Sequence, residues 1–172
     1  MSKEQVAFKG RIVKVTLDTV TLPNGKRADI EVVHHPGGAA VVALDAQQRV
    51  CLLRQYRPVF RDWIWELPAG KLDPGEGPLA TAQRELIEEA GVKAARWTPL
   101  GGIMSSPGVF GEVVHLYLAQ DLTAVSADTE EHELIEVHWV PLAEAIARAS
   151  DGDVNDAKTL AGLFRVIGRL KQ

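Results

Sequence analysis

Three glutamates crowd one helical stretch of this sequence, at a spacing that suits a metal ion. Residues 79–90 have the period of a helix, and Glu85, Glu88 and Glu89 lie in its second half. Because Glu88 and Glu89 follow Glu85 by three and four residues, the carboxylates share one stripe of the helix. Carboxylate oxygens are the ligands that Mg²⁺ prefers, and Mg²⁺ usually keeps waters and substrate phosphates as further ligands. The stripe therefore indicates a divalent-cation site that could act on a phosphate.

The alternative interpretation of this stripe is a solvated acidic face that binds nothing. The glutamates lie opposite the apolar arc of the helix, so Glu85 and Glu89 are expected to face solvent. Arg84 is placed to pair with Glu88 and to relieve part of the repulsion. The preceding segment, residues 70–78, favours the metal site, because a tight Gly/Pro-rich loop could present backbone carbonyls to the same ion. The apolar arc consists of Leu79, Ala82, Leu86, Ile87 and Ala90.

The loop and the helix together resemble the signature of the Nudix hydrolases. That signature is Gly, five residues, Glu, seven residues, Arg-Glu, an aliphatic residue, any residue, Glu-Glu, any residue, Gly and an aliphatic residue. Residues 70–92 match it at every specified position. The resemblance implies a Nudix α/β/α sandwich around a mixed sheet and the metal-assisted hydrolysis of a diphosphate. The matching residues are Gly70, Glu76, Arg84, Glu85, Leu86, Glu88, Glu89, Gly91 and Val92.

The resemblance also implies how the motif holds its metal, Mg²⁺ with Mn²⁺ as a possible substitute. The glutamates at the positions of Glu85 and Glu89 are direct ligands in the family, and the one at Glu88 joins them in some members, as a ligand or a catalytic group. The arginine at Arg84 orients the carboxylates and does not react. In related pyrophosphatases the carbonyl of the alanine corresponding to Ala69 is a further ligand.

Residues outside the motif narrow the resemblance to the ADP-ribose and nucleotide-sugar pyrophosphatases. The sequence Glu-Leu-Pro-Ala-Gly at 66–70 is common to that subgroup. Pro107 follows Gly91 by sixteen residues, which is the spacing of the proline that marks the ADP-ribose enzymes. Glu112 is implied to face the ribose or the waters bound to the metal. The alternatives are that Pro107 only makes a turn and that Glu112 faces solvent.

A second acidic cluster, residues 128–133, is the candidate source of the catalytic base. In the family a loop glutamate at this place is a general base or a metal ligand. The resemblance assigns the base to Glu131, with Glu133 as the alternative, because loop lengths vary; His132 departs from the usual pattern. By composition alone the segment would be a surface loop without a catalytic role.

Three arginines are candidates for binding substrate. Arginine suits phosphate oxygens because its planar guanidinium donates two parallel hydrogen bonds. An arginine in the Arg54–Arg57 segment binds the diphosphate in the subgroup, and Arg57 is favoured over Arg54. Arg27 is a weaker candidate for a residue contributed to the other subunit of a dimer. Each could instead form a surface salt bridge. Trp63 and Trp65 could stack on a base, although strand tryptophans are more often core residues.

The elements around these residues predict an α/β (α+β) fold preceded by a small antiparallel β subdomain. Alternating residues over 11–22, a turn at 23–25 and a further strand near 30–33 predict a hairpin or small meander. His34 to Gly38 break that pattern, which divides the chain into an N-terminal subdomain, 1–38, and a Nudix domain, 39–172. The subgroup uses its N-terminal strands to form a homodimer. Further strands are expected at 39–44, 49–54, 63–67, 96–104, 112–119 and 134–140, and further helices at 142–149 and 156–170.

Composition excludes several classes of protein. The chain has 172 residues, 46% of them hydrophobic, and a net charge of −4, which argues against a non-specific nucleic-acid binder. No apolar run approaches the ~18 residues of a membrane span. The N-terminus carries no apolar signal segment, so a cytoplasmic location is expected. Cys51, the single cysteine, lies in an apolar run and is expected to be a core residue.

The expected activity is Mg²⁺-dependent cleavage of ADP-ribose to AMP and ribose 5-phosphate. Another nucleotide sugar, such as GDP-mannose, is the alternative substrate, because the motif acts on the diphosphate and does not distinguish the base or the sugar. A ligand-sensing Nudix module is a more distant alternative, which the intact glutamates disfavour.

Overall fold

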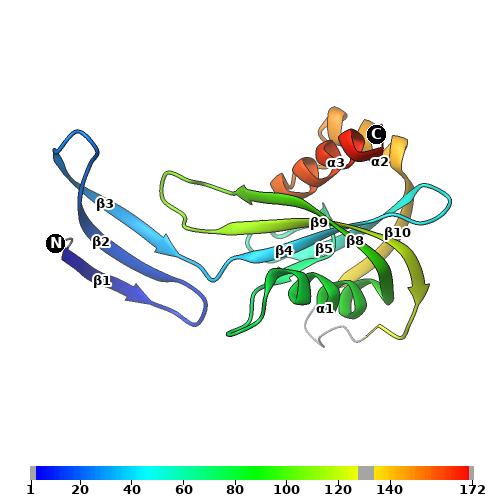
Figure 1. Ribbon diagram of the computed structural model, residues 1–172, viewed down its shortest axis with the longest axis horizontal. Helices are drawn as coiled ribbons and strands as arrows, with labels where there is room; N and C mark the ends of the chain where they lie inside the picture. Colours follow the sequence, from blue (N-terminus) through cyan, green and yellow to red (C-terminus); the bar gives the residue numbers. More distant parts are fainter. Residues whose placement is uncertain (1–2, 128–133, 171–172) are drawn as a thin grey trace.

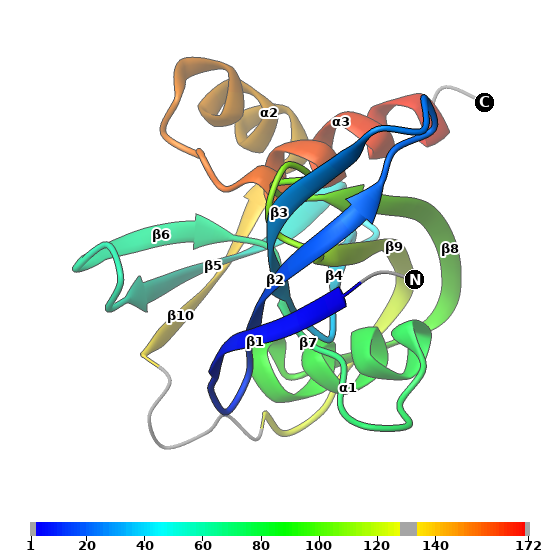
Figure 2. The same ribbon diagram turned by 90° about the vertical axis from the view of Figure 1, so that its left-hand side faces the viewer.

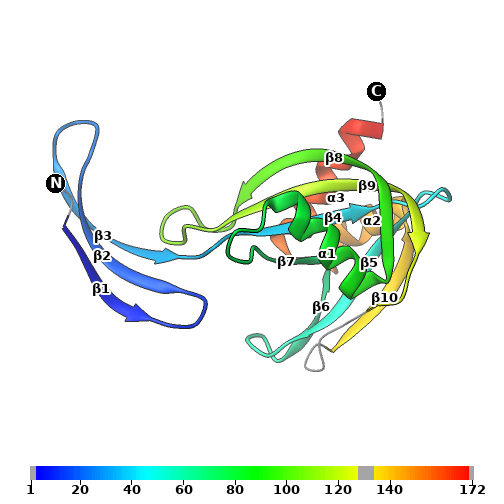
Figure 3. The same cartoon turned by 60° about the horizontal axis from the view of Figure 1, so that its bottom comes forward.

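The computed structural model describes residues 3–127 and 134–170. Its first three strands, β1 (Lys3–Lys9), β2 (Lys14–Thr21) and β3 (Arg27–His34), form an antiparallel meander. Figures 1 and 3 show this sheet standing apart from the rest of the molecule, to which β3 connects it. Gly25 takes the positive φ of 80° that the turn between β2 and β3 requires. The predicted N-terminal antiparallel β structure is therefore confirmed, as a three-stranded meander.

The body of the protein contains two sheets and three helices. One sheet has the order β7-β4-β9-β8, with β4 and β9 parallel and the other neighbours antiparallel, and the second has the order β10-β5-β6 and is antiparallel. The strands are β4 (Gly38–Ala43), β5 (Arg49–Arg57), β6 (Asp62–Glu66), β7 (Ala69–Lys71), β8 (Val92–Met104), β9 (Val113–Ala124) and β10 (Ile135–Pro141). The helices are α1 (Pro78–Ala90), α2 (Leu142–Asp151) and α3 (Ala157–Leu170).

The helices cover the sheets from opposite sides, with α1 on one face and α2 and α3 on the other (Figures 1 and 2). Strand β4 is buried along its whole length. Because side chains of a strand alternate between faces, Val42 packs in the cluster that contains Leu163 of α3, and Val41 packs in the cluster that contains Leu86 of α1. This arrangement confirms the predicted α/β/α sandwich with a mixed sheet.

Local signals account for the bounds of α1. Pro78 occupies the first turn, where its missing N–H removes no hydrogen bond. Gly91 follows the helix with a φ of 63°, and its N–H donates to the last carbonyls of the helix. Strand β8 starts directly after this glycine, four residues earlier than the sequence predicts. The short strand β7 was not predicted, because Pro68 and the glycines after it resemble a loop.

Cys51 is buried in the core, as predicted. Burial raises the pKa of its thiol to about 12, and the charge of Glu89 adds to the effect. The thiol is therefore protonated at neutral pH and unreactive. None of the helices in the described part of the chain is long and apolar enough to cross a membrane.

Two glycines of α3 give a matched test of this packing. An added methyl at buried Gly162 would lie 2.7 Å from Leu67 Cδ1 and 3.0 Å from Val42 Cγ2, whereas one at Gly168 would meet nothing within 4 Å. Gly162→Ala is expected to lower the free energy of unfolding by about 1–3 kcal/mol, because both neighbours are held in the core. Gly168→Ala is expected to raise it by about 0.5–1 kcal/mol through helix propensity. Urea unfolding measures both, and a Gly162→Ala protein as stable as Gly168→Ala would contradict this packing.

Candidate active site

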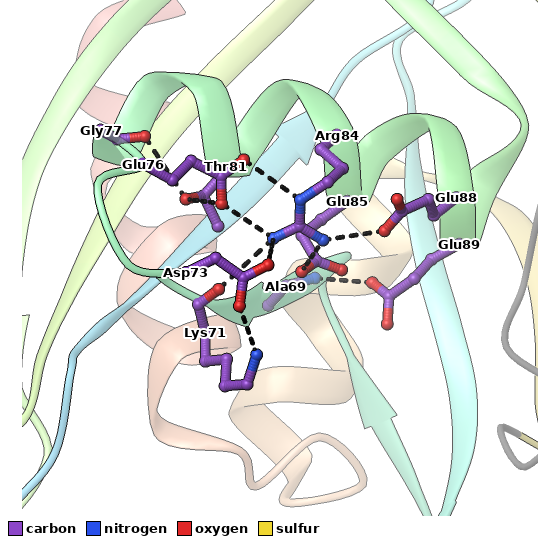
Figure 4. Close-up of polar contacts among 10 residues, drawn as sticks. All are labelled: Ala69, Lys71, Asp73, Glu76, Gly77, Thr81, Arg84, Glu85, Glu88 and Glu89. Carbon is purple, nitrogen blue, oxygen red and sulfur yellow. Dashed lines mark hydrogen bonds and ion pairs between the residues drawn. The ribbon is translucent and has the colours of Figure 1, made fainter. Parts of the chain in front are cut away.

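Helix α1 and strand β7 bring the glutamates against the backbone of residues 69 and 70 (Figure 4). Glu89 is only 3% exposed, and its Oε2 accepts a hydrogen bond of 2.8 Å from the backbone N–H of Ala69. The carboxylate of Glu85 lies over Gly70, where a Cβ would be 1.7 Å from Glu85 Oε1. The expectation that Glu85 and Glu89 face solvent is therefore wrong. Glu85 occupies the space that Gly70 leaves beside the helix, and Glu89 is held by the backbone of Ala69.

Arg84 links the carboxylates of the loop and the helix. Its Nη1 donates to Glu85 at 2.7 Å and to Glu88 at 2.8 Å, which confirms the predicted Arg84–Glu88 pair. Its Nε and Nη2 donate to the two oxygens of Glu76 at 3.1 and 3.0 Å. Thr81 Oγ1 donates to Glu76 as well. Arg84 thus stands as the orienting residue that the resemblance implied.

These contacts shift the pKa values of Glu76 and Arg84. The hydrogen bond from Arg84 lowers the pKa of Glu76 to about 2, against the opposing effect of burial, and the hydrogen bond from Thr81 adds to the lowering. The same contact with Glu76, with help from Glu88 and Glu85, raises the pKa of Arg84 further above its usual range. Glu76 and Arg84 are therefore both charged at neutral pH.

The donor chemistry of this corner fits a hard divalent cation. Its available ligands are carboxylate oxygens from Glu85, Glu88 and Glu89, next to the backbone of Ala69, and Mg²⁺ and Mn²⁺ favour such ligands. Among the residues that the structure describes, no three acidic, histidine or cysteine side chains already converge as a metal cage. A cation bound to Glu85 and Glu88 would compete with Arg84 for the same oxygens.

A pocket of about 290 Å³ opens next to this corner. Three of the predicted site residues line it together, namely Ala69, Arg57 and Glu112. Gly70 lines it too, so the pocket borders the backbone on which the glutamates rest. A ligand in the pocket would lie near both Arg57 and the backbone of Ala69 and Gly70, on which the carboxylates of α1 rest.

The other predicted substrate residues lie away from this pocket. The guanidinium of Arg54 lies 5.7 Å from the centre of the Trp63 ring and 3.8 Å from Glu136. Because residues an odd number apart on a strand point to opposite faces, Arg54 and Arg57, three apart on β5, do not point to the same face. Pro107 lies in the exposed loop between β8 and β9, and Arg27 is exposed at the start of β3. Glu131 and Glu133 lie outside the described residues.

The two tryptophans pack against other side chains of the protein. Trp65 packs against the main core cluster, with the guanidinium of Arg148 5.2 Å from its ring. Trp63 meets Tyr56 edge-on at 5.9 Å. Neither tryptophan lines the pocket, so the stacking of a base on Trp63 or Trp65 is not supported. The contacts of Trp65 fit the interpretation of this residue as part of the core.

Lys158 lines the pocket, and buried Glu66 joins it to Arg57; the sequence predicted a role for neither. Glu66 is buried and accepts two hydrogen bonds from Arg57, at 2.6 and 2.8 Å, and a third from Lys158. Burial works to raise the pKa of Glu66, but the hydrogen bond from Arg57 and the charge of Lys158 outweigh it, so the pKa lies below its usual value. An acidic residue within the apolar run 63–67 was the available signal for Glu66. Nothing local marks Lys158.

His35 also lines the pocket, although the sequence suggested no role for it. Its Nδ1 lies 3.3 Å from Glu112 Oε1, and its ring is 5.3 Å from that of Phe110. The backbone of Val33 adds two hydrogen bonds of 2.8 Å to the same loop, one from its N–H to Val109 and one to its carbonyl from Gly111. The end of β3 and the segment after it therefore fix the loop that carries Glu112.

Comparison with known proteins agrees with this geometry. The model of the NUDIX domain matches residues 34–163. The chain belongs to the Nudix hydrolase family. It is 39% identical to the ADP-ribose pyrophosphatase of Bacillus subtilis (strain 168) over 161 residues, which cover 92% of this chain and 86% of that protein.

Two further proteins are similar to this Nudix hydrolase. The GDP-mannose pyrophosphatase of Cronobacter sakazakii is 33% identical, over 78% of this chain and 78% of its own length. The crystal structure of an ADP compounds hydrolase superposes with a TM-score of 0.83 at 28% identity, and covers 98% of this chain and 92% of its own. Family members generally use divalent metal ions, which agrees with the donor set around Ala69.

The Glu76–Arg84 contact predicts a pH-dependent contribution to stability. Because the folded-state pKa of Glu76 is about 2, below its ordinary value of 4.5, the stabilisation is present above pH 4.5 and is lost as the pH falls from 4.5 towards 2. Glu76→Gln is expected to cost about 1 kcal/mol at pH 7, and this cost should shrink between pH 4.5 and pH 3. Urea unfolding across this range measures it. A cost that stays the same from pH 7 to pH 3 would contradict the ionic role of Glu76.

Proposed function

We propose that this Nudix hydrolase is a Mg²⁺-dependent pyrophosphohydrolase that cleaves ADP-ribose to AMP and ribose 5-phosphate. The observation that carries the proposal is the pocket lined by Arg57 and by the backbone of Ala69 and Gly70, because the α1 glutamates lie against this same backbone and Arg57 is a cation that suits phosphate. The similarity to an ADP-ribose pyrophosphatase over most of both chains supports the choice of substrate.

The residues divide the work as follows in this proposal. Glu85 and Glu89, with the Ala69 carbonyl and with Glu88, hold the metal. When bound, Mg²⁺ neutralises diphosphate charge and lowers the pKa of a water molecule. Arg84 keeps the carboxylates oriented through its contacts with Glu85 and Glu88.

The substrate side of the pocket completes the reaction. Arg57 donates hydrogen bonds to the diphosphate, and Glu112 accepts one from a ribose hydroxyl. Glu131, or Glu133 in its place, takes the proton of the attacking water. The water oxygen bonds to one phosphorus, the bond from that phosphorus to the bridging oxygen breaks, and the two monophosphates leave without a covalent intermediate.

A second candidate substrate is another nucleotide sugar, such as GDP-mannose. The similarity to a GDP-mannose pyrophosphatase favours it, and the motif residues contact the diphosphate that both substrates share. A ligand-sensing module without activity is disfavoured, because every glutamate of the motif is present.

A phosphate-release screen tests the proposed activity. Purified protein with Mg²⁺ is mixed with a phosphatase that releases phosphate from the products. The substrates are ADP-ribose, GDP-mannose, ADP-glucose, UDP-glucose, NADH and diadenosine polyphosphates. ADP-ribose is expected to be cleaved fastest. A preference for GDP-mannose would replace the substrate and keep the chemistry, whereas no cleavage of any compound would contradict the enzyme itself.

Single substitutions in the same assay test the assigned roles. Glu85→Gln and Glu89→Gln are each expected to lower kcat by about 10²-fold or more, because an amide is a poor ligand for Mg²⁺. Glu131→Gln should lower kcat with little change in Mg²⁺ affinity, and a loss confined to Glu133→Gln would move the base to Glu133. Unchanged melting temperatures are the control for folding, and near-wild-type activity of Glu85→Gln or Glu89→Gln would refute the metal site.

We also propose that residues 1–38 form a homodimer contact, with Arg27 reaching the site of the partner subunit. Exposed apolar side chains of the N-terminal sheet support this, because a partner subunit could cover them. They are Val6 and Ile30 on one face, Phe8 and Leu17 on the other, and Ile12 in the turn between β1 and β2. The net charge of −4 gives no support to a nucleic-acid partner, no membrane partner is proposed, and the buried free Cys51 fits a reducing compartment such as the cytoplasm.

Charge substitutions on two exposed phenylalanines test the dimer. Phe8 of β1 is 55% exposed, and Phe164 of α3 is 78% exposed. Helix α3 belongs to the body of the protein, apart from the N-terminal sheet (Figure 1). Phe8→Glu is expected to convert dimer to monomer in analytical ultracentrifugation, because it would bury a charge in the contact. Phe164→Glu is the control and should leave the mass unchanged. A monomeric wild-type protein, or a dimer unaffected by Phe8→Glu, would contradict this interface.

A further inference from the structure

Arg57 and Lys158 share a single buried carboxylate at the edge of the pocket. Both oxygens of Glu66 are engaged, Oε1 by Arg57 Nε and Oε2 by Arg57 Nη2 and Lys158 Nζ. Arg57 and Lys158 also line a second, more apolar cleft formed with Pro58, Val59, Phe60 and Ile64. The two cations therefore stand at the wall between the two hollows.

The position of Lys158 is unfavourable unless its charge is needed there. Its side chain is only 15% exposed, so the ammonium has lost most of its water. It lies in the first turn of α3, where the helix dipole disfavours a positive charge. Asp156 compensates in part, because it lies 3.1 Å from Lys158 and caps the helix through Thr159. The remaining partner of the lysine is Glu66.

The consequence for Arg57 follows from the geometry of its guanidinium. Nε and one N–H of Nη2 are bound to Glu66, so the plane of the group is fixed, and Nη1 and the second N–H of Nη2 are left to meet a ligand. Lys158 anchors that carboxylate to α3, 92 residues further along the chain. Without the anchor, Glu66 would carry its charge against Arg57 alone and could turn with it.

We propose that Lys158 is a positioning residue for the diphosphate, acting through Glu66 on the orientation of Arg57. The inference rests on the proposed function, in which Arg57 binds the diphosphate. Lys158 itself remains bound to Glu66 and Asp156 and does not contact the substrate. Neighbouring strands β5 and β6 and the start of α3, which is far from them in the sequence, therefore set one phosphate contact.

Steady-state kinetics with the best diphosphate substrate of the wild type test the role. Lys158→Met keeps the length of the side chain and removes its charge. It is expected to raise KM about tenfold and to change kcat less than about threefold, because the affected contact binds the diphosphate. Lys158→Arg should restore KM to within about threefold of wild type. Lys93→Met, at an exposed position on β8, is the control and should change neither constant.

A double-mutant cycle separates positioning from direct binding. In an Arg57→Met background, Lys158→Met is expected to change KM less than about twofold, because the residue it positions is gone. A second, full tenfold rise would mean that Lys158 contacts the substrate itself, and would overturn the proposal. Unchanged KM in the single variant, or a fall in kcat with KM unchanged, would overturn it as well.

Glu66→Gln keeps the test decisive if Lys158→Met folds poorly. It preserves the shape of the side chain and is expected to raise KM about as much as Lys158→Met, and an unchanged KM would refute the pathway through Glu66. The two claims fail separately. A wild type that cleaves no nucleoside diphosphate contradicts the proposed function, whereas an active wild type with these variants unaffected contradicts only the role of Lys158.

Discussion

The guanidinium of Arg84 is the contact on which the site depends. Glu76, Glu85 and Glu88 would repel one another if brought together alone, and a single arginine bonds to all three. Because Glu76 belongs to the loop and the others to α1, the same group closes the loop onto the helix. The charge that the site needs for a metal is thus assembled around a cation that belongs to the protein.

A glycine and a backbone N–H also fix the positions of two of the carboxylates. Gly70 leaves room for the carboxylate of Glu85, and the N–H of Ala69 fixes that of Glu89. These contacts need β7 to lie against β4, and β4 to lie between two cores. The position of each carboxylate is therefore a property of the whole sandwich.

The sequence predicted most of the architecture and the local parts of the site. The spacing of Glu85, Glu88 and Glu89, the end of the helix at Gly91 and the meander at the N-terminus are local signals, and the structure contains all of them. The burial of Glu85 and Glu89 could not be foreseen, because it depends on what packs opposite the helix. The pairing of Glu66 with Lys158 could not be foreseen either, since it joins residues 92 positions apart.

The end of β3 and the segment after it do more than connect the N-terminal sheet to the body of the protein. Val33, near the end of β3, is bonded to Val109 and Gly111, and His35 lies against Glu112. These contacts join the end of the N-terminal sheet to one wall of the pocket, so the position of the wall depends on the position of the sheet. Removing the sheet would therefore release that wall, even though none of the residues of β1 or β2 lines the pocket.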